Sequence, residues 1–250
     1  MALLGNLGAE SVGVEEFERR IFESVNAARA ESGIRPLASD PGLVDLARTH
    51  SRNMAWQGFF SHRDKQGLQV SQRLEKYHPE LLHAGIGENL YYLERSDRKY
   101  DPAQIVNGWM NSAEHRANLL QPEYTHTGIG IFLMGNKLYT TQVYAIPILR
   151  LLSPLPGKLS RGKSYVLEFE YLSPISGEDL QFLLATPDPK ARIRVNDFVY
   201  HEGMIPLNVI WRDKTRLSLV LAFPGGKGTY SLQVGWDGYF YTDMLKFRVK

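Results

Sequence analysis

The hydrophobic periodicity of the sequence changes at a proline- and glycine-rich stretch, Leu152-Ser-Pro-Leu-Pro-Gly157. Before this stretch, apolar residues recur at spacings of three and four, as they do along one face of a helix. After it, short segments alternate apolar and polar residues, as strands with one buried face do. We therefore predict a layered α+β domain at residues 15–150 and an all-β domain at 158–250. A linker at 151–157 joins them, and an extension at 1–14 precedes them.

The N-terminal half carries signals that open and close helices. Val14 begins an amphipathic stretch with acidic residues in its first turn, and Gly33 ends it. Asp40-Pro41 and Asp101-Pro102 each place a capping carboxylate before a proline that suits the first helical turn. Leu68–Tyr77 is a shorter helical candidate. We expect helices at all four places.

Strands are predicted between and after these helices. Gly87–Leu93 is the first candidate, and residues 128–134 and 137–145 flank the turn signal Gly135-Asn136. Helices around antiparallel strands predict the layered α+β fold of this domain.

The C-terminal half contains about seven short alternating segments in about 95 residues, which favours a β-sandwich of immunoglobulin-like type. Tyr230 lies in a segment that resembles the late strands of such domains, where a tyrosine often occupies a sheet corner. The predicted strands are Ser164–Leu172, Leu180–Thr186, Ala191–Tyr200, Leu207–Trp211, Arg216–Phe223, Thr229–Gly235 and Tyr239–Val249.

Composition excludes several classes of protein. The 250 residues include no cysteine, which excludes disulfides, thiolate metal sites and cysteine nucleophiles. The formal net charge of +2 is too small to indicate a nucleic-acid partner. No apolar run approaches the roughly 20 residues of a membrane helix. The first eight residues lack a basic region and a long apolar region, so we expect no signal peptide in them.

The sequence lacks the motifs that would indicate three common enzyme classes. No Gly-x-Ser-x-Gly elbow and no Walker loop occurs, and Gly85-Ile-Gly87 lacks the third glycine of a dinucleotide fingerprint.

A set of short segments follows in a specific order between residues 15 and 148. They are Val25-Asn26-Ala-Ala-Arg29, Gly33-Ile-Arg-Pro-Leu37, Phe60-Ser61-His62, Gly87-Glu88-Asn89-Leu90, Trp109-x-x-Ser112-x-x-His115-Arg116-x-Asn118, Tyr124-x-x-x-Gly128-Ile-Gly130 and Thr141-Gln142-Val143. This ordered set resembles the CAP superfamily (cysteine-rich secretory proteins, antigen 5 and pathogenesis-related 1) in its cysteine-free bacterial form. The C-terminal half is not covered by the resemblance.

The resemblance implies a three-layer α-β-α sandwich with a cleft in which histidines and glutamates gather. His62, Glu88 and His115 match cleft residues of the family, and Ser112 matches the serine three residues before His115. The sequence departs from eukaryotic members, because Leu138–Gln142 lacks their second cleft histidine and Ser112 stands where they carry a helix glutamate.

Three kinds of chemistry are open to these residues. Two imidazoles and a carboxylate suit Zn²⁺ or another divalent cation, so His62, Glu88 and His115 are candidate metal ligands and candidate catalytic residues. Without metal, a histidine beside a glutamate can act as an acid–base pair. The same groups can also form a structural network with one another and with water.

Other polar residues near these motifs have both functional and structural interpretations. Glu114 and His126 are further candidates for the cleft, whereas His50 on an apolar helix stripe reads as a core histidine with satisfied hydrogen bonds. The His115-Arg116-x-Asn118 segment can instead form a helix-end network in which the last two side chains bond backbone carbonyls.

Two functions follow from the resemblance. The first is a secreted or cell-envelope binding module whose partner is a lipid, sterol, glycan, metal or protein, with no nucleic acid and no membrane-spanning segment. The second is a metal-dependent hydrolase or protease that uses the same cleft. The resemblance places the protein outside a bacterial cell or in its envelope, with any signal peptide absent from these residues.

Overall fold

A computed structural model describes residues 13–194 and 200–250 of the chain. They form two compact units, each described here by itself. The N-terminal unit extends to His78 and continues with Gly85–Ile146, and the C-terminal unit consists of Pro79–Ala84 and Pro147–Lys250. The predicted domain limits at 150 and 158 stay a prediction. The predicted extension 1–14 lies outside the described residues except for its last two.

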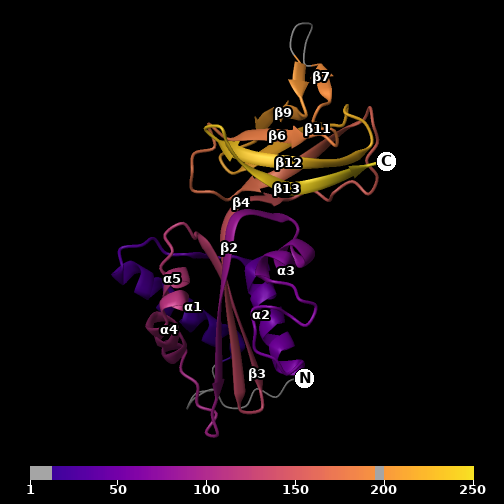
Figure 1. Cartoon of the computed structure of the whole chain (residues 1–250). Helices are drawn as coiled ribbons and strands as arrows, with labels where there is room; N and C mark the ends of the chain where they lie inside the picture. Colours follow the sequence, from indigo (N-terminus) through magenta and orange to yellow (C-terminus); the bar gives the residue numbers. More distant parts are fainter. Residues whose placement is uncertain (1–12, 195–199) are drawn as a thin grey trace. The chain divides into compact units, whose positions relative to one another are not determined.

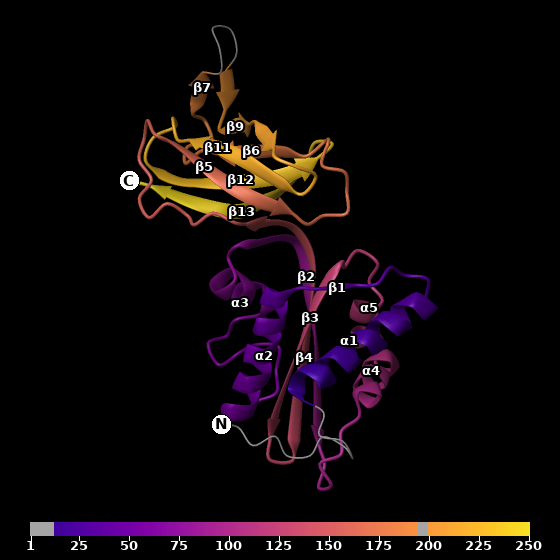
Figure 2. The ribbon, with the colours of Figure 1, turned by 180° about the vertical axis from the view of Figure 1, so that it is seen from behind.

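Five helices and four strands lie wholly or mostly in the N-terminal unit among the described residues. They are α1 (Val14–Glu31), β1 (Ala38–Ser39), α2 (Pro41–Trp56), α3 (Val70–Tyr77), β2 (Leu81–Glu94), α4 (Pro102–Asn111), α5 (Ala113–Leu119), β3 (His126–Met134) and β4 (Lys137–Leu151). The sheet order is β1-β3-β4-β2. Figures 1 and 2 show α2 and α3 on one face of this sheet and α1, α4 and α5 on the other. The sequence pattern predicts a layered α+β domain, and the α-β-α order of the layers is the one that the family resemblance implies.

Local signals set the helix starts as predicted. The Asp40 carboxylate accepts a hydrogen bond from the Leu43 amide at 3.0 Å, and Pro41 occupies the first turn of α2. Asp101 caps α4 in the same way, accepting from the Ala103 amide at 2.9 Å. Each cap satisfies an amide that has no partner within its helix.

Two of the elements that differ from the prediction are β2 and α5. Strand β2 spans 14 residues and begins at Leu81, well before the predicted start at Gly87. The seven-residue helix α5 was not predicted, because fewer than two turns are too short to display a helical period.

The C-terminal unit is built of strands. They are β5 (Ser164–Tyr171), β6 (Gln181–Ala185), β7 (Arg192–Arg194), β8 (Tyr200–Glu202), β9 (Met204–Leu207), β10 (Val209–Trp211), β11 (Arg216–Ala222), β12 (Gly228–Trp236) and β13 (Tyr239–Val249). One sheet has the order β5-β11-β10, with the end of β4 paired to β5, and the other has the order β13-β12-β6-β9. Figure 2 shows β5 lying beside β11.

The two sheets enclose one apolar core, as in a β-sandwich. Leu219 on β11 and Leu232 on β12 are fully buried in this core. The predicted alternation holds only in part: Val220 after Leu219 is exposed, but Ser218 before Leu219 and Gln233 after Leu232 are buried as well. The predicted strand Ala191–Tyr200 is instead a hairpin of β7 and β8, and its middle, 195–199, lies outside the described residues.

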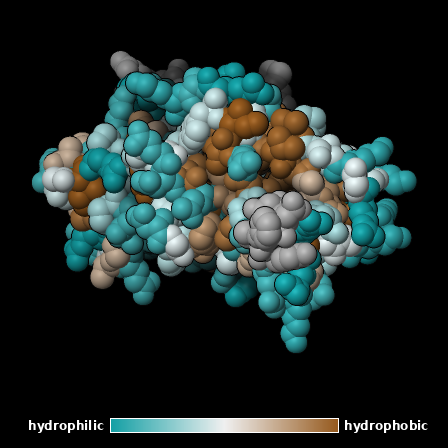
Figure 3. Space-filling model, turned by 90° about the horizontal axis from the view of Figure 1, so that it is seen from above, coloured by the Kyte–Doolittle hydropathy of each residue, from teal (hydrophilic) through white to brown (hydrophobic). Residues whose placement is uncertain are grey.

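Some apolar side chains of the C-terminal unit face solvent. Val166, Ile210 and Val220, on three neighbouring strands, are each more than 40% exposed. Figure 3 shows that apolar residues gather in one region of the surface seen from above. In the described parts of the chain, no helix is both long enough and apolar enough to cross a membrane.

Candidate functional site

The candidate site is built around Glu88 on the edge strand β2. Glu88 is 6% exposed, so its carboxylate needs hydrogen-bond or ion-pair partners within the protein. The His62 Nδ1 atom lies 2.8 Å from Glu88 Oε1, and the Arg73 guanidinium donates to Glu88 Oε2. Both carboxylate oxygens are therefore engaged by side chains that come from outside β2.

Arg73 on α3 is a site residue that the sequence analysis missed. Its side chain is 2% exposed, and besides Glu88 it donates to the carbonyl oxygens of His62 at 2.8 Å and Leu68 at 3.0 Å. The guanidinium thus neutralises the buried carboxylate and holds the loop that carries His62. One signal could have found it, because a buried glutamate requires a buried cation and Arg73 lies on a predicted helix beside the buried Leu74.

The imidazole of His62 is exposed to solvent, although the Glu88 carboxylate that it bonds is buried. Its side chain is 57% exposed, whereas that of Glu88 is 2% exposed. A carboxylate can only accept a hydrogen bond, so the hydrogen-bonded proton is on His62 Nδ1, which donates to Glu88. In the neutral imidazole the Nε2 atom is then a hydrogen-bond acceptor, and its orientation is fixed by a charged partner.

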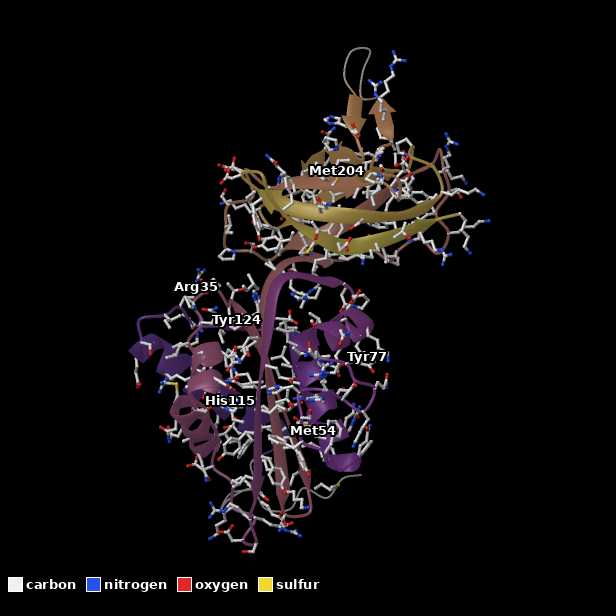
Figure 4. All side chains as sticks on the ribbon, in the orientation of Figure 1. Arg35, Met54, Tyr77, His115, Tyr124 and Met204 are labelled. Atoms are coloured by element: carbon white, nitrogen blue, oxygen red, sulfur yellow. The ribbon has the colours of Figure 1, made fainter. Side chains whose placement is uncertain are left out.

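His115 on α5 lies on the other side of β2, as Figure 4 shows. Burial lowers its pKa, the charge of nearby His62 lowers it further, and Glu114 opposes both effects. The His115 carbonyl oxygen accepts a hydrogen bond from Asn89 Nδ2 at 2.9 Å. His62 and His115 are therefore electrostatic neighbours on opposite sides of an edge strand.

The helix-end network that the sequence leaves open for this segment is confirmed. Arg116 donates to the Met110 carbonyl at 3.2 Å, and Asn118 donates to the Glu88 carbonyl at 3.3 Å. Asn118 also donates to Asn89 Oδ1 at 3.0 Å. The two Asn118 bonds fasten α5 to β2, and the Arg116 bond fastens α5 to α4.

The Gly87-Glu88-Asn89 tripeptide has three separate physical roles. A Cβ on Gly87 would lie 2.3 Å from the Tyr124 hydroxyl, so this position admits no larger side chain without displacing that ring. Glu88 faces Arg73 and His62, and Asn89 faces α5, because successive side chains of a strand point to opposite faces.

The three remaining predicted cleft residues lie on other elements than Glu88. Ser112 is the residue between α4 and α5, and Glu114 is exposed in the first turn of α5. His126 begins β3, which β4 separates from β2, and its Nδ1 atom lies 2.9 Å from Thr125 Oγ1. Among residues 13–194 and 200–250, the Glu88 carboxylate is bonded to His62 and Arg73 and to none of these three side chains.

The donor set does not fit a metal held by His62, Glu88 and His115 together. Glu88 is bonded to Nδ1 of His62, so a cation on the free Nε2 atom would lie on the opposite edge of the ring from the carboxylate. A cation beside Glu88 would also meet the Arg73 guanidinium. Within residues 13–194 and 200–250, no three His, Cys, Asp or Glu side chains gather closely enough to hold a metal ion.

His50 lies beneath the site and is fully buried. Its Nε2 atom is 3.0 Å from the Ser61 carbonyl oxygen, but its Nδ1 atom has no hydrogen-bond partner. The prediction of a core histidine with satisfied hydrogen bonds therefore holds for one of the two ring nitrogens. Burial lowers the pKa of His50, and the charge of Glu88 opposes this effect. His50 also contacts Phe59 edge-on, with ring centroids 5.9 Å apart.

We expect the free energy of unfolding to fall as the pH is lowered below about 6.5, the ordinary pKa of histidine. Burial lowers the pKa of His50 and His115 in the folded protein, so the unfolded chain binds more protons between the lowered values and 6.5. Urea unfolding at about pH 7.5 and about pH 5.5 measures the effect. His50→Gln should reduce the difference and the control His201→Gln should not; equal differences in all three proteins would contradict the prediction.

The domain is an α-β-α sandwich whose edge strand carries Glu88, and this carboxylate holds the loop histidine His62. Residues 22–144 match the family model of CAP, the cysteine-rich secretory protein family, and this part of the chain belongs to that family. The domain has no cysteine.

Two curated relatives come from Bacillus subtilis (strain 168). The membrane protein YlbC is 34% identical over 123 residues, which are 49% of this chain and 33% of YlbC. The protein YkwD is 29% identical over 129 residues, which are 52% of this chain and 47% of YkwD. The chain thus spans between a third and about half of the length of these relatives.

A solved structure of an SCP-domain extracellular protein from Bacillus anthracis (strain Ames) is also similar. It is 26% identical, with a TM-score of 0.45, and the match covers 56% of this chain and 44% of that protein.

Proposed function

We propose that this protein is a binding protein of the extracellular space or cell envelope, and that its CAP domain contacts the ligand through His62. The observation that carries the proposal is the complete engagement of the Glu88 carboxylate by Arg73 and His62. The buried Arg73–Glu88 ion pair is held in place by its surroundings, and Glu88 in turn orients the exposed imidazole of His62.

In this proposal the ligand is recognised by a hydrogen bond that it donates to the Nε2 atom of His62, whose orientation is fixed. A ligand hydroxyl or amide can donate to Nε2 of His62 without reorganising the pair beneath it, because Arg73 and Glu88 already satisfy each other. A ligand that crosses β2 would also meet His115, which lies on the other side of the strand.

The metal-dependent hydrolase needs Glu88 as a ligand or as a free base. Both roles conflict with the two bonds that its carboxylate makes, so we do not advance that function. The proposed location rests on the secretory family to which residues 22–144 belong.

The C-terminal sandwich is, in this proposal, an immunoglobulin-like recognition module. Tyr230 on β12 is fully buried, and its hydroxyl donates to the Gly226 carbonyl at 3.0 Å. A buried tyrosine that bonds backbone a few residues upstream supports that assignment.

Titration of the full chain with a defined panel tests the proposal. The panel contains phosphatidylcholine vesicles with and without cholesterol, phosphatidylglycerol vesicles, and acidic and neutral polysaccharides. We expect saturable binding to at least one probe and a loss of about tenfold or more in His62→Ala, as for a central contact residue.

His201→Ala, which removes a half-buried imidazole from the C-terminal unit, is the control and should bind as the native protein does. The proposal fails if no probe saturates or if His62→Ala binds as tightly as the native chain. Stoichiometric Zn²⁺ binding that Glu88→Gln abolishes would also overturn it.

A further inference from the structure

Five aromatic side chains form a row across the sheet of the N-terminal unit. The ring centroids of Trp56 and Phe132 are 5.7 Å apart, and Phe132 on β3 lies directly opposite Tyr139 on β4. Tyr139 is 5.1 Å from Tyr92 on β2, and Tyr92 is 5.8 Å from Phe60. The row therefore crosses three neighbouring strands, and its ends come from the end of α2 and the loop after it.

The row has a buried middle and exposed ends. Tyr139 is 6% exposed, whereas Trp56 is 67% and Phe60 is 50% exposed. The middle belongs to a small core with Met54 and Leu90, so the exposed rings rest on a packed base. Rigid aromatic rings in water offer contact area at a low cost in conformational entropy.

Two cations accompany the row. The Arg52 guanidinium lies 5.4 Å from the Trp56 ring, and the Lys65 ammonium lies 5.3 Å from the ring of Phe59, which packs against the same small core. Both basic residues are exposed, so their charges are available to an external anion. A ligand that covers the rings will therefore meet positive charge near the Trp56 end and near Phe59.

The row leads to the His62 site. Phe60 is two residues before His62, and Glu88, Leu90 and Tyr92 alternate along β2 and so share one face of the sheet. A ligand on the rings thus continues toward the exposed imidazole.

We propose that the aromatic row binds an acidic polysaccharide, an inference that rests on the proposed binding function. Sugar rings present flat apolar faces that stack on aromatic rings, their hydroxyls can donate to His62 Nε2, and their acidic groups pair with Arg52 and Lys65. A linear chain can lie along a row of rings that single small molecules would not fill.

The same surface is less suited to an anionic lipid bilayer. Tyr92 Oη donates to the carboxylate of Glu94 at 2.9 Å, so a negative charge lies beside the row. A continuous bilayer would force that carboxylate against phosphates and strip its water, whereas a polysaccharide chain with spaced charges leaves it hydrated.

Affinity electrophoresis of the full chain tests the inference. The probes are polygalacturonate, alginate and hyaluronate, with dextran as the neutral polysaccharide, inorganic polyphosphate as charge without sugar, and equimolar phosphatidylcholine–phosphatidylglycerol vesicles in a parallel sedimentation assay. We expect at least one acidic polysaccharide to bind about tenfold or more tightly than dextran and polyphosphate.

The double variant Trp56→Ala/Phe60→Ala should lose about tenfold of that affinity or more. Arg52→Gln/Lys65→Gln keeps the rings and should weaken binding mainly at low salt. The control is Tyr239→Ala, which removes an aromatic ring of matching 68% exposure from the C-terminal unit. Thermal unfolding of each variant shows whether it is folded.

Polysaccharide binding that the two ring substitutions leave unchanged would overturn the inference. So would tighter binding to polyphosphate or vesicles than to every acidic polysaccharide. If the acidic polysaccharides fail while another probe binds in a His62-dependent way, the inference falls and the proposed function stands. If nothing in either panel binds, both fall.

Discussion

Arg73→Met should lower the free energy of unfolding by about 3–5 kcal/mol, the usual cost of removing one partner of a buried ion pair. The substitution strands the buried Glu88 carboxylate with His62, whose imidazole is more than half exposed. It also removes the bonds to the carbonyl oxygens of His62 and Leu68, so the loop that positions His62 loses its anchor. Urea unfolding measures the loss, and ligand binding at His62 should weaken with it.

Two further variants separate the ion pair from general disruption. The double variant Arg73→Met/Glu88→Leu removes both charges and should recover much of the loss, because the unpaired carboxylate is then gone. Arg63→Met changes an exposed arginine on the same loop and should stay within about 0.5 kcal/mol of the native protein. Additive effects in the double variant would contradict the ion-pair explanation.

Gly130→Ala should be about as damaging, with an expected loss of about 3 kcal/mol. A Cβ at this position of β3 would lie 2.0 Å from the Arg48 amide nitrogen and 2.4 Å from the Ala47 carbonyl carbon. Both atoms belong to the backbone of α2, so no side-chain rotation relieves the clash and the helix must move away from the sheet. Thermal and urea unfolding measure the effect.

Gly135→Ala in the turn of the same hairpin is the matched control. No atom lies within 4 Å of its added Cβ, but its φ of +64° disfavours alanine, so the expected loss is about 1 kcal/mol. An equal or smaller loss for Gly130→Ala would show that close packing of α2 on β3 is not the reason for glycine at 130.

Residue patterns were sufficient for part of the site. The ordered motifs and the family resemblance predicted that His62 and Glu88 belong to one cleft, and their side chains lie 2.8 Å apart. The same reasoning grouped His126 with them, although β4 separates its strand from β2. Spacing along the chain could not distinguish these cases, because it does not say which strands become neighbours.

What the sequence by itself determined about this protein depends on interactions between residues that are close along the chain. Asp40 and Asp101 mark helix starts through caps that span at most four consecutive residues, and alternation along a strand predicts its buried face without reference to the rest of the chain. Zero cysteines likewise excluded disulfides at once.

Tertiary structure decided the partners of the buried groups. Arg73 meets Glu88 because α3 packs beside β2, and the aromatic row forms because α2, β2, β3 and β4 bring together residues as distant as Trp56 and Tyr139. Burial removes water from a charge and so requires an opposite charge nearby, but many arginines in the sequence could supply it. Packing of the helices on the sheet places Arg73 beside Glu88, so the residue that the sequence offered as a metal ligand is paired with an arginine in the structure.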